Sequence, residues 1–402
     1  MPLRKDNLKI ILFQLVILPF LFSCNSSSSS SSSTDSNSGS YFVKGGFGLF
    51  ANGGNGVKYG NFELYLMGLI PPSEVEDIVY FDNVTQTTDD LNNRCSDGEW
   101  CPIFHSTSKK TLSITELEQN YGKRDPDSSQ SQKSFNAMVM MISKTDLTQS
   151  EIVDLSNDVN YFDNASENYG NFAWATGSRA SLTLDNLTNS QKDNTTTSYT
   201  YNNRDYKILD NGSFVSVVIS DSEYSNWNDG SINYISTFSN RTSFFEDVYK
   251  IFKDDFDFFI ILHNNASLPS TFSYYGLHMS VSSSIKGISK TSTTYDYSSY
   301  YGSSGKLKFV IHIPYNGLLS GPTLHEIFHH WGNYILDSQF TNQQSAGSHW
   351  GFSSACCQLG GFEKSKLNQS STARSVHSKK TDSQLEISKS SFYDMDVLNY
   401  ED

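Results

Sequence analysis

The chain has 402 residues and a formal net charge of -14, from 29 basic and 43 acidic side chains. This length is enough for two or three domains, and an apolar content of 37% with 14% aromatic residues predicts a largely folded protein. Phosphate binding requires clustered lysines and arginines, which this acidic chain lacks, so nucleic acid is excluded as the main ligand.

The sequence pattern of residues 1–23 predicts a signal peptide. Basic residues precede the apolar run "IILFQLVILPFLF", which is too short for a comfortable membrane span. The ending "LFSC" resembles a bacterial lipoprotein box, and this resemblance implies that cleavage leaves Cys24 as a lipidated (palmitate-bearing) first residue. A plain cleaved signal is the alternative.

Residues 24–40 continue as a serine-rich stretch, "NSSSSSSSSTDSNSGS", after Cys24. Such a composition cannot bury a core and predicts a flexible tether. We therefore expect a lipid-anchored protein of the cell envelope, at the outer membrane or the cell surface, with the folded part held away from the membrane.

Four other cysteines remain. Cys95 and Cys101 flank a short polar loop, and a local disulfide between them is expected after export. Cys356 and Cys357 are adjacent, where a ring is strained, and pairing across the two groups stays open. Neither pair has the spacing of a structural zinc site.

We expect an accessory region over residues 41–200. The region opens with a glycine-rich loop, and an apolar segment, "FELYLMGLI", then ends at two prolines, after which Ser73 and Glu76 predict a helix start. Further along, periodicity predicts a buried strand in "SFNAMVMMIS", an amphipathic helix in "LTQSEIVDLSNDVNYFDNAS" and a strand in "RASLTLDNL".

A catalytic region is expected over residues 201–362, followed by a poorly defined tail, 363–402. Its predicted elements are a strand in "GSFVSVVIS", a helix in "FFEDVYKIFKDDF", a fully buried strand in "FDFFIILHN" and a strand in "LKFVIHIPY" with one buried and one partly polar face. "TSTTYDYSSYYGSSG" predicts a surface loop, with substrate contact as the alternative. Alternating strands and helices indicate an α+β or α/β fold.

The stretch "GPTLHEIFHHWGNYIL" carries the chemistry. On a helix, His325 and His329 lie one turn apart on the same face, within reach of one metal ion. Glu326 is rotated by one position and is suited to activate the water at a zinc ion as a general base. The alternative is a helix whose histidines have only surface or capping roles.

The glycine at Gly332 resembles the helix-ending glycine of the metzincin metallopeptidases, but Ile335 occupies the position of their usual third histidine. Downstream, "GSHW" resembles the leishmanolysin-type metzincins, in which an insertion precedes the third ligand. The resemblance covers roughly residues 321–361 and implies His325, His329 and His349 as ligands of zinc. Asp337 and Glu363 are rival ligands, since zinc also binds carboxylates.

Metzincins also have a methionine beneath the zinc, and "QLGGF" at the expected place contains none. The chain further resembles putative metalloprotease lipoproteins of spirochaetes such as Leptospira, in which the segment similar to "NFELYLMGLIPPSEV" follows the helix. Here it comes first, so we expect a permuted order in which Met67 supplies the floor of the zinc site. The alternative is that the segment belongs only to the core.

Other histidines are expected to be structural: His263, His278 and His312 lie in or near strands, and His330 is expected to point away from the metal. The sequence thus predicts a metzincin-like, membrane-anchored zinc metalloendopeptidase that hydrolyses extracytoplasmic proteins or peptides. The alternative is a catalytically degraded surface lipoprotein that acts as an adhesin or binding module.

Overall fold

The structure is a computed structural model, and it describes residues 38–45, 54–229, 231–233, 238–264, 276–289, 294–332 and 349–369. All of these residues belong to one compact unit, Ser33–Asp402. The predicted signal peptide, Cys24, nearly all of the tether, Asp337 and Ile335 lie outside the described residues. None of the helices in the described ranges has the length and hydropathy that membrane crossing requires.

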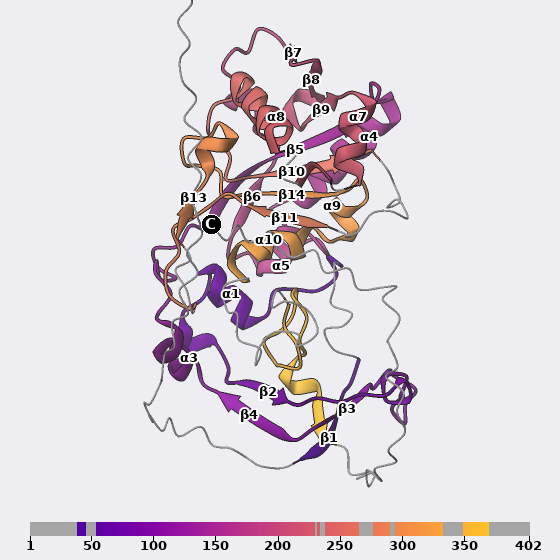
Figure 1. Cartoon of the computed structure of the whole chain (residues 1–402), viewed down its shortest axis with the longest axis vertical. Coiled ribbons are helices and arrows are strands. Elements are labelled where there is room, and N and C mark those ends of the chain that lie inside the picture. Colours follow the sequence, from indigo (N-terminus) through magenta and orange to yellow (C-terminus); the bar gives the residue numbers. More distant parts are fainter. Residues whose placement is uncertain are drawn as a thin grey trace, which may run out of the picture. The chain divides into compact units, whose positions relative to one another are not determined.

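A mixed β-sheet forms the centre of the fold (Figure 1). Its main path runs through β11 (Leu277–Ser280), β14 (Phe309–Pro314), β10 (Phe258–His263), β5 (Ser134–Ser143), β9 (Phe214–Val218), β8 (Arg204–Leu209) and β7 (Ser198–Tyr201). The four strands from β14 to β9 are parallel, and the short β6 (Ser181–Thr183) adds to β5 in parallel. The strands at either end, β11, β8 and β7, are antiparallel. The α+β class is confirmed, and the expected boundary near residue 200 lies within this sheet.

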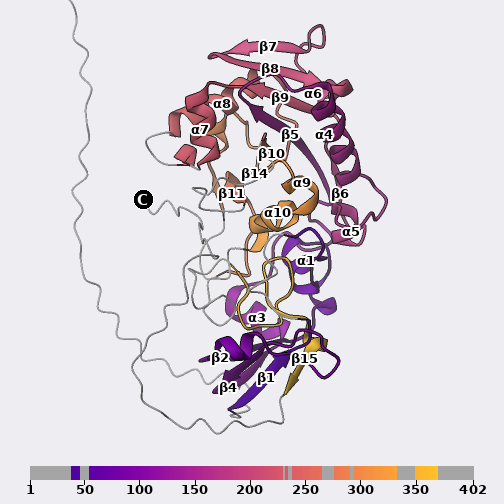
Figure 2. The same ribbon diagram turned by 90° about the vertical axis from the view of Figure 1, so that its right-hand side faces the viewer.

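Helices cover both faces of the sheet. One face packs against α1 (Asn61–Met67), α4 (Gln149–Phe162), α5 (Phe172–Thr176), α9 (Gly317–Ser320) and α10 (Thr323–Gly332). The other packs against α7 (Asp221–Asn228), α8 (Phe238–Ile251) and the short α6 (Leu187–Ser190). Figure 2 shows α7 and α8 on the opposite side of the strands from α4 and α9.

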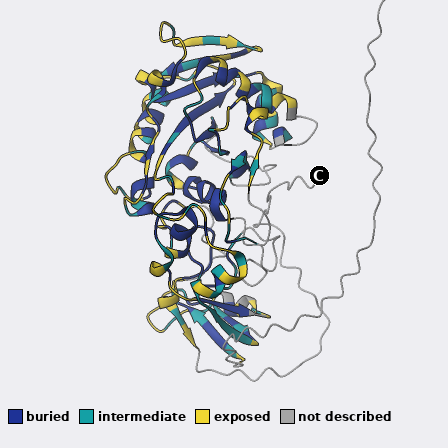
Figure 3. Ribbon diagram, turned by 90° about the vertical axis from the view of Figure 1, so that its left-hand side faces the viewer, coloured by how far each residue is buried: buried dark blue, intermediate teal, exposed yellow. Residues whose placement is uncertain are grey.

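Burial on both faces corrects one expectation. All six residues of β14 are buried, although the sequence pattern predicted a partly polar face. Figure 3 shows the strands at the centre of the sheet mainly in the dark blue of buried residues. Phe309, Ile311 and Ile313 enter the core beneath α10, whereas Val310 enters the core beneath α8. His312, the polar residue of the strand, is buried against Trp227 of α7 with ring centroids 5.2 Å apart.

The helix start expected at Ser73 is also wrong. Only one 3₁₀ turn, η1 (Pro72–Glu74), forms there, with Pro71 at its N-cap. The Glu74 carbonyl accepts a hydrogen bond from Asn61 Nδ2, and the chain is already extended at Val75. The turn therefore leads directly into strand β2 (Ile78–Asp82).

The other predicted strands and helices are present with shifted ends. Helix α4 begins within the segment where the sequence predicted a helix, because Thr148 and Glu151 form a reciprocal capping box at its start. α3 (Ile114–Tyr121) begins in the same way at Ser113 and Glu116.

Smaller sheets lie apart from the central one. β15 (Leu367–Gln369), β1 (Gly39–Val43) and β3 (Ile103–Ser106) form one, β2 and β4 (Ser108–Leu112) a second, and β12 (Ser282–Ser283) and β13 (Tyr295–Asp296) a third. α2 (Thr88–Leu91) lies near β3. A small aromatic core joins the first two sheets, and β15 places the start of the expected tail, residues 363–369, in this region. The expected Cys95–Cys101 disulfide is present, and Cys356 pairs with Cys357.

Candidate metal centre

Side chains from distant parts of the chain hold the start of helix α10. The Leu324 N–H donates to Asn55 Oδ1 at 3.1 Å, and Asn55 Nδ2 donates to the Leu318 carbonyl at 2.9 Å. Thr323 Oγ1 donates to the Gly317 carbonyl at 2.7 Å. Since N–H groups in the first turn have no partner inside a helix, Asn55 acts as a cap from outside it. These bonds fix α10 against the sheet.

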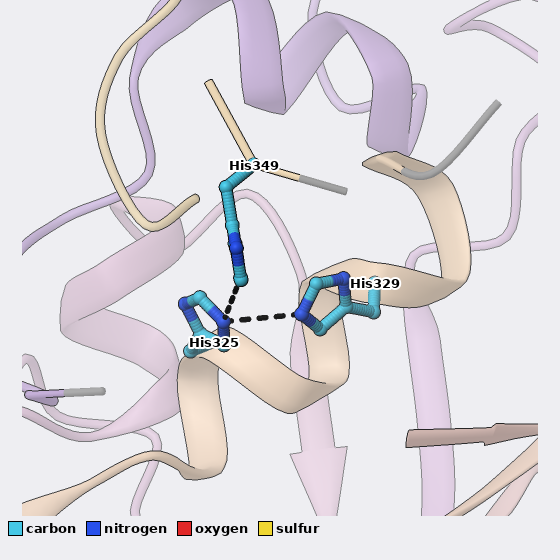
Figure 4. A group of neighbouring side chains, drawn as sticks. All are labelled: His325, His329 and His349. Atoms are coloured by element: carbon cyan, nitrogen blue, oxygen red, sulfur yellow. Dashed lines mark hydrogen bonds between the residues drawn. The ribbon is translucent and has the colours of Figure 1, made fainter. Parts of the chain in front are cut away.

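Three imidazole rings converge beside α10 (Figure 4). His325 and His329 lie one turn apart on the helix, and His349 comes from the segment that follows it. His325 Nε2 is 3.0 Å from His329 Nε2 and 2.9 Å from His349 Nε2. The structure thus brings together all three histidines that the sequence nominated as ligands, in a group that could hold a metal ion.

The hydrogen bonds of His325 decide which of its nitrogens is free to bind a metal. His325 Nδ1 lies 2.6 Å from the carbonyl oxygen of Gln358, which can only accept a hydrogen bond. Nδ1 must therefore carry the proton, and the lone pair of the neutral ring is on Nε2. This nitrogen faces the other two rings. A backbone acceptor behind a metal-binding histidine is the usual way in which its tautomer and orientation are set.

The donor set fits a small transition-metal ion. Two nitrogens bound tetrahedrally at about 2.0–2.1 Å are separated by about 3.3 Å, close to the spacing of these rings. Burial lowers the pKa of His325 well below its usual range, with further lowering from His329 and His349. Burial and the charge of His329 lower the pKa of His349 to about 3. The rings of His325 and His349 are therefore neutral near pH 7, which is the form that binds a metal.

Glu63 of α1 organises the segment that carries His349. Its carboxylate is fully buried and accepts from the N–H groups of Gln358 and Leu359, each at 3.0 Å. Trp350 Nε1 donates to it at 3.0 Å, and so does Gly60 N–H at its own helix start. The Glu63 carboxylate thus binds Trp350, which is next to His349. It also binds the N–H of the peptide group whose carbonyl, that of Gln358, orients His325.

The groups named above all donate hydrogen bonds to Glu63, so they require an acceptor at this position. Burial raises the pKa of its carboxyl group, and the backbone N–H donors around it oppose that rise. Since every neighbour named here donates, a group that also donates would leave at least one N–H without a partner. Strand β2 adds two backbone contacts to the same segment: Ser354 N–H donates to the Val79 carbonyl at 2.7 Å and Phe81 N–H to that of Phe352 at 3.1 Å.

Glu326, the expected general base, lies in the first turn of α10 and is only 5% exposed. Its carboxylate lies against Gly276 at the start of β11, where a Cβ atom would come within 2.5 Å of Glu326 Oε1. The glycine therefore leaves room for the carboxylate. The Glu326 carbonyl accepts from Nδ1 of His278 on β11 at 2.9 Å, so helix and strand are joined beside the metal ligands.

The four histidines that the sequence analysis expected to lie outside the ligand group, His263, His278, His312 and His330, are buried. Burial lowers the pKa of His330 to about 3, with additional lowering from Lys308 and Arg124, and His330 is not part of the ligand group. His263 Nδ1 lies 3.0 Å from His312 Nε2, on the neighbouring strands β10 and β14. His278 is buried as well, and it contacts α10 directly.

Met67 lies at the end of α1, buried in the same core cluster as Leu324 and Phe328. The helix contacts α10 (Figure 1), so the early segment docks beside the candidate centre, and the floor role of Met67 stays a prediction. Among the rival ligands, Glu363 is exposed and pairs with Lys366 at 2.9 Å, outside the histidine group. Asp337 lies outside the described residues.

Sequence reasoning selected the right segment around α1 but overlooked Glu63. The signal was present, because an acidic residue inside the apolar run "NFELYLMGL" is a candidate for a buried carboxylate. Its partners follow almost 300 positions later, and no local pattern points to them. Asn55 and Gln358 were missed for the same reason.

Comparison of the chain with protein-family models, curated proteins and solved structures gives no match.

Proposed function

We propose that the chain is a zinc-dependent metalloendopeptidase in which His325, His329 and His349 hold the metal. The observation that carries the proposal is the convergence of three imidazole nitrogens beside a buried glutamate. Three histidines leave one position of a tetrahedral site open, as catalytic rather than structural zinc sites do. Bound zinc supplies Lewis-acid activation of a peptide carbonyl and of the attacking water.

Glu326 acts as the proton carrier. Its carboxylate takes a proton from the attacking water, whose oxygen bonds to the scissile carbonyl carbon. The carboxyl group then gives the proton to the departing amine nitrogen as the peptide bond breaks. Gly276 keeps space around Oε1 of this carboxylate. Proton transfer of this kind contributes about 10²–10⁴ to a rate.

Strand β11 orients the substrate. It pairs with β14 on one side and is an edge of the central sheet as far as that sheet is described. An edge strand can pair with an extended peptide through main-chain hydrogen bonds. Because Gly276 and His278 connect this strand to Glu326, a peptide paired there lies next to the proton carrier.

The resemblance to leishmanolysin-type metzincins and to spirochaete metalloprotease lipoproteins is consistent with this assignment, and the permuted order is part of the proposal. We also propose that Cys24 carries lipid and anchors the enzyme in the bacterial cell envelope, where it meets protein or peptide substrates. Cys24→Ala should then release the protein from the membrane fraction of the producing cell without changing its zinc content.

Glu326→Gln tests the catalytic assignment. The variant should keep its zinc, because Glu326 is not a ligand, and should lose peptide hydrolysis by about 10²–10⁴-fold. Glu363→Gln is the matched control, since it removes an exposed carboxylate and should keep both zinc and activity. Unchanged hydrolysis in Glu326→Gln would overturn the assignment. Zinc binding without hydrolysis in the wild type would favour the non-catalytic binding module.

A further inference from the structure

A cavity of about 260 Å³ lies beyond the end of α10, away from the three candidate ligands. His330 and Trp331 form part of its wall, and none of the three candidate ligands is among its described lining residues. Tyr295 and Asp296, from the tyrosine-rich stretch, also line it. This stretch has no role in the proposed peptidase. Met67, the expected floor of the zinc site, lines the cavity as well, so the cavity adjoins α1 and α10 without including the three candidate ligands.

Arg124 is the most informative residue in this wall. It is only 7% exposed, and its Nε donates to the Leu66 carbonyl at 2.6 Å. Nη1 donates to Ser131 Oγ at 2.6 Å and also to the Pro126 carbonyl. No carboxylate lies within ion-pair distance of Arg124 among the described residues. All of its partners there are neutral.

A guanidinium without a counter-ion is costly to bury. Burial lowers the pKa of Arg124 to about 10, and Tyr65, Asp125 and Asp127 offset this only in part, so the group remains a cation near pH 7. The C-terminal carbonyls of α1 supply only partial negative charge. The positive charge of Arg124 is therefore not fully compensated, and an anion bound in the cavity would compensate it.

A second cation faces the same cavity. Lys308 Nζ lies 3.0 Å from Asp257 Oδ1, and Lys306 Nζ lies 3.1 Å from the same oxygen. Two ammonium groups thus share one buried carboxylate, which leaves one positive charge in excess. Of the two lysines, only Lys308 lines the cavity. Asp296 is the opposing charge, and it is exposed at the rim, where water screens it.

Neutral hydrogen-bonding groups complete the wall. Four serines line the cavity: Ser131, Ser282, Ser283 and Ser284. Ser131 and Ser282 already donate to the carbonyls of Asp127 and Leu307, so the donors considered for a ligand are the hydroxyls of Ser283 and Ser284. His330 Nδ1 is buried and has no hydrogen-bond partner among the residues that the structure describes. Hydroxyl groups beside two cations are the combination that carboxylate and phosphate oxygens accept from.

We propose that this cavity binds an oxyanion, a carboxylate or a phosphate group, between Arg124 and Lys308. Its volume suits a group of this size rather than a whole nucleotide or an organic cofactor. The ligand is either a free inorganic oxyanion or the side chain of an acidic peptide. The proposal does not depend on peptidase activity.

Two lysine variants provide a matched test on the full chain. Each of Lys308→Met and Lys306→Met removes one ion pair with Asp257, but only the first removes a charge from the cavity wall. Calorimetric titration with inorganic phosphate and with N-acetylaspartate amide should show about tenfold weaker binding in Lys308→Met. Lys306→Met also removes the excess charge beside Asp257, but it leaves Lys308 in the cavity wall, so it should weaken binding by clearly less than Lys308→Met does. Binding of phosphate alone would assign a free oxyanion, and binding of the aspartate derivative would assign an acidic peptide.

Ser284→Asp tests the same point at an exposed position where folding is not at risk. The added carboxylate should repel the anion and weaken binding as strongly as Lys308→Met does. Binding must also persist after metal chelation, since phosphate can bind a zinc ion directly. The proposal is wrong if the wild type binds neither probe at about 10 mM, if both lysine variants bind equally, or if chelation abolishes binding.

Discussion

Two groups of histidines, all buried except the half-buried His349, differ in a way that explains why only one group is assigned to a metal. His263 and His312 lie side by side on parallel strands, with one nitrogen of each ring 3.0 Å from the other. His325, His329 and His349 instead direct three Nε2 atoms toward one another, and His325 is oriented from behind by the Gln358 carbonyl.

Burial and a lowered pKa do not distinguish the two groups. Burial lowers the pKa of His263 to about 4 and that of His312 well below its usual range, much as it does for the ligand group. A pair can satisfy itself, because one neutral ring donates and the other accepts. Three nitrogens that converge on one point cannot all be satisfied by hydrogen bonds among themselves. A metal cation at that point, by contrast, accepts all three lone pairs. Convergence is therefore the informative feature.

The largest effect is expected from removing a converging ring. His349→Ala should lose nearly all zinc, with affinity falling more than about 1,000-fold because one of three ligands is gone. His312→Ala, the matched change in the pair, should keep full zinc affinity and lower the free energy of unfolding by about 3 kcal/mol. Zinc titration by competition with a chromophoric chelator measures both. Equal zinc affinities in the two variants would remove the distinction between the groups.

Acid should destabilise the metal-free chain through both groups. Their folded pKa values lie below the unfolded value of about 6.5, so the unfolded state takes up protons first as the pH falls. The stability is present above pH 6.5 and is lost toward pH 4 for His263 and toward pH 3 for His349. Each histidine contributes about 1.4 kcal/mol per pH unit.

Urea unfolding at pH 7 and pH 5 checks this slope, and zinc should reduce the part that comes from the ligand group. Asp163, whose pKa burial raises to about 6, acts in the opposite direction, and burial raises the pKa values of Glu63, Asp158 and Glu223 in the same sense. A free energy of unfolding that does not change between these pH values would mean that the rings are already protonated or exposed.

Glu63→Gln should weaken zinc binding by about 10–100-fold, the usual cost of disturbing groups behind the ligands. The amide places a donor among N–H groups that need an acceptor, so the segment with His349 and Gln358 shifts. Glu116→Gln is the control, because that glutamate occupies the same capping position in α3. It should leave zinc affinity unchanged. An identical response of the two variants would show that Glu63 is only a cap.

The smallest effect is expected from removing one tyrosine hydroxyl group, and two tyrosines allow a comparison. Tyr59 donates to the Leu324 carbonyl of α10 at 2.7 Å, and Tyr224 donates to the Asn264 carbonyl beside His263 at 3.1 Å. Each change to Phe should cost about 1 kcal/mol of stability. Only Tyr59→Phe should also lower zinc affinity, by a few-fold, because it loosens the helix that carries two ligands. Thermal unfolding and zinc titration separate the two outcomes.

Local patterns predicted the parts of the fold that are set locally. The run "FDFFIILHN" is apolar throughout, and β10 is buried on both faces. The spacing of His325 and His329 required only a helix. For β14, the alternation suggested a polar face, but α7 and α8 cover that side, and the identity of a covering helix cannot be read from a strand.

Long-range contacts explain the rest. Resemblance, rather than spacing, nominated His349, since an insertion separates it from α10. The docking of α1 was anticipated through Met67, whereas the contacts that bind it to the site come from Glu63. Apart from Trp350, the donors to Glu63 are backbone N–H groups, which every residue but proline carries, so the sequence does not indicate which residues bind this carboxylate.

X-ray absorption spectroscopy on the zinc-loaded chain tests the metal centre most directly. We predict one zinc per chain with three imidazole nitrogens at about 2.0–2.1 Å and one further light-atom ligand. The His349→Ala variant should show two imidazoles or no bound zinc. A wild-type chain that binds no zinc would contradict the account. So would a His349→Ala variant in which zinc is still bound by three imidazoles.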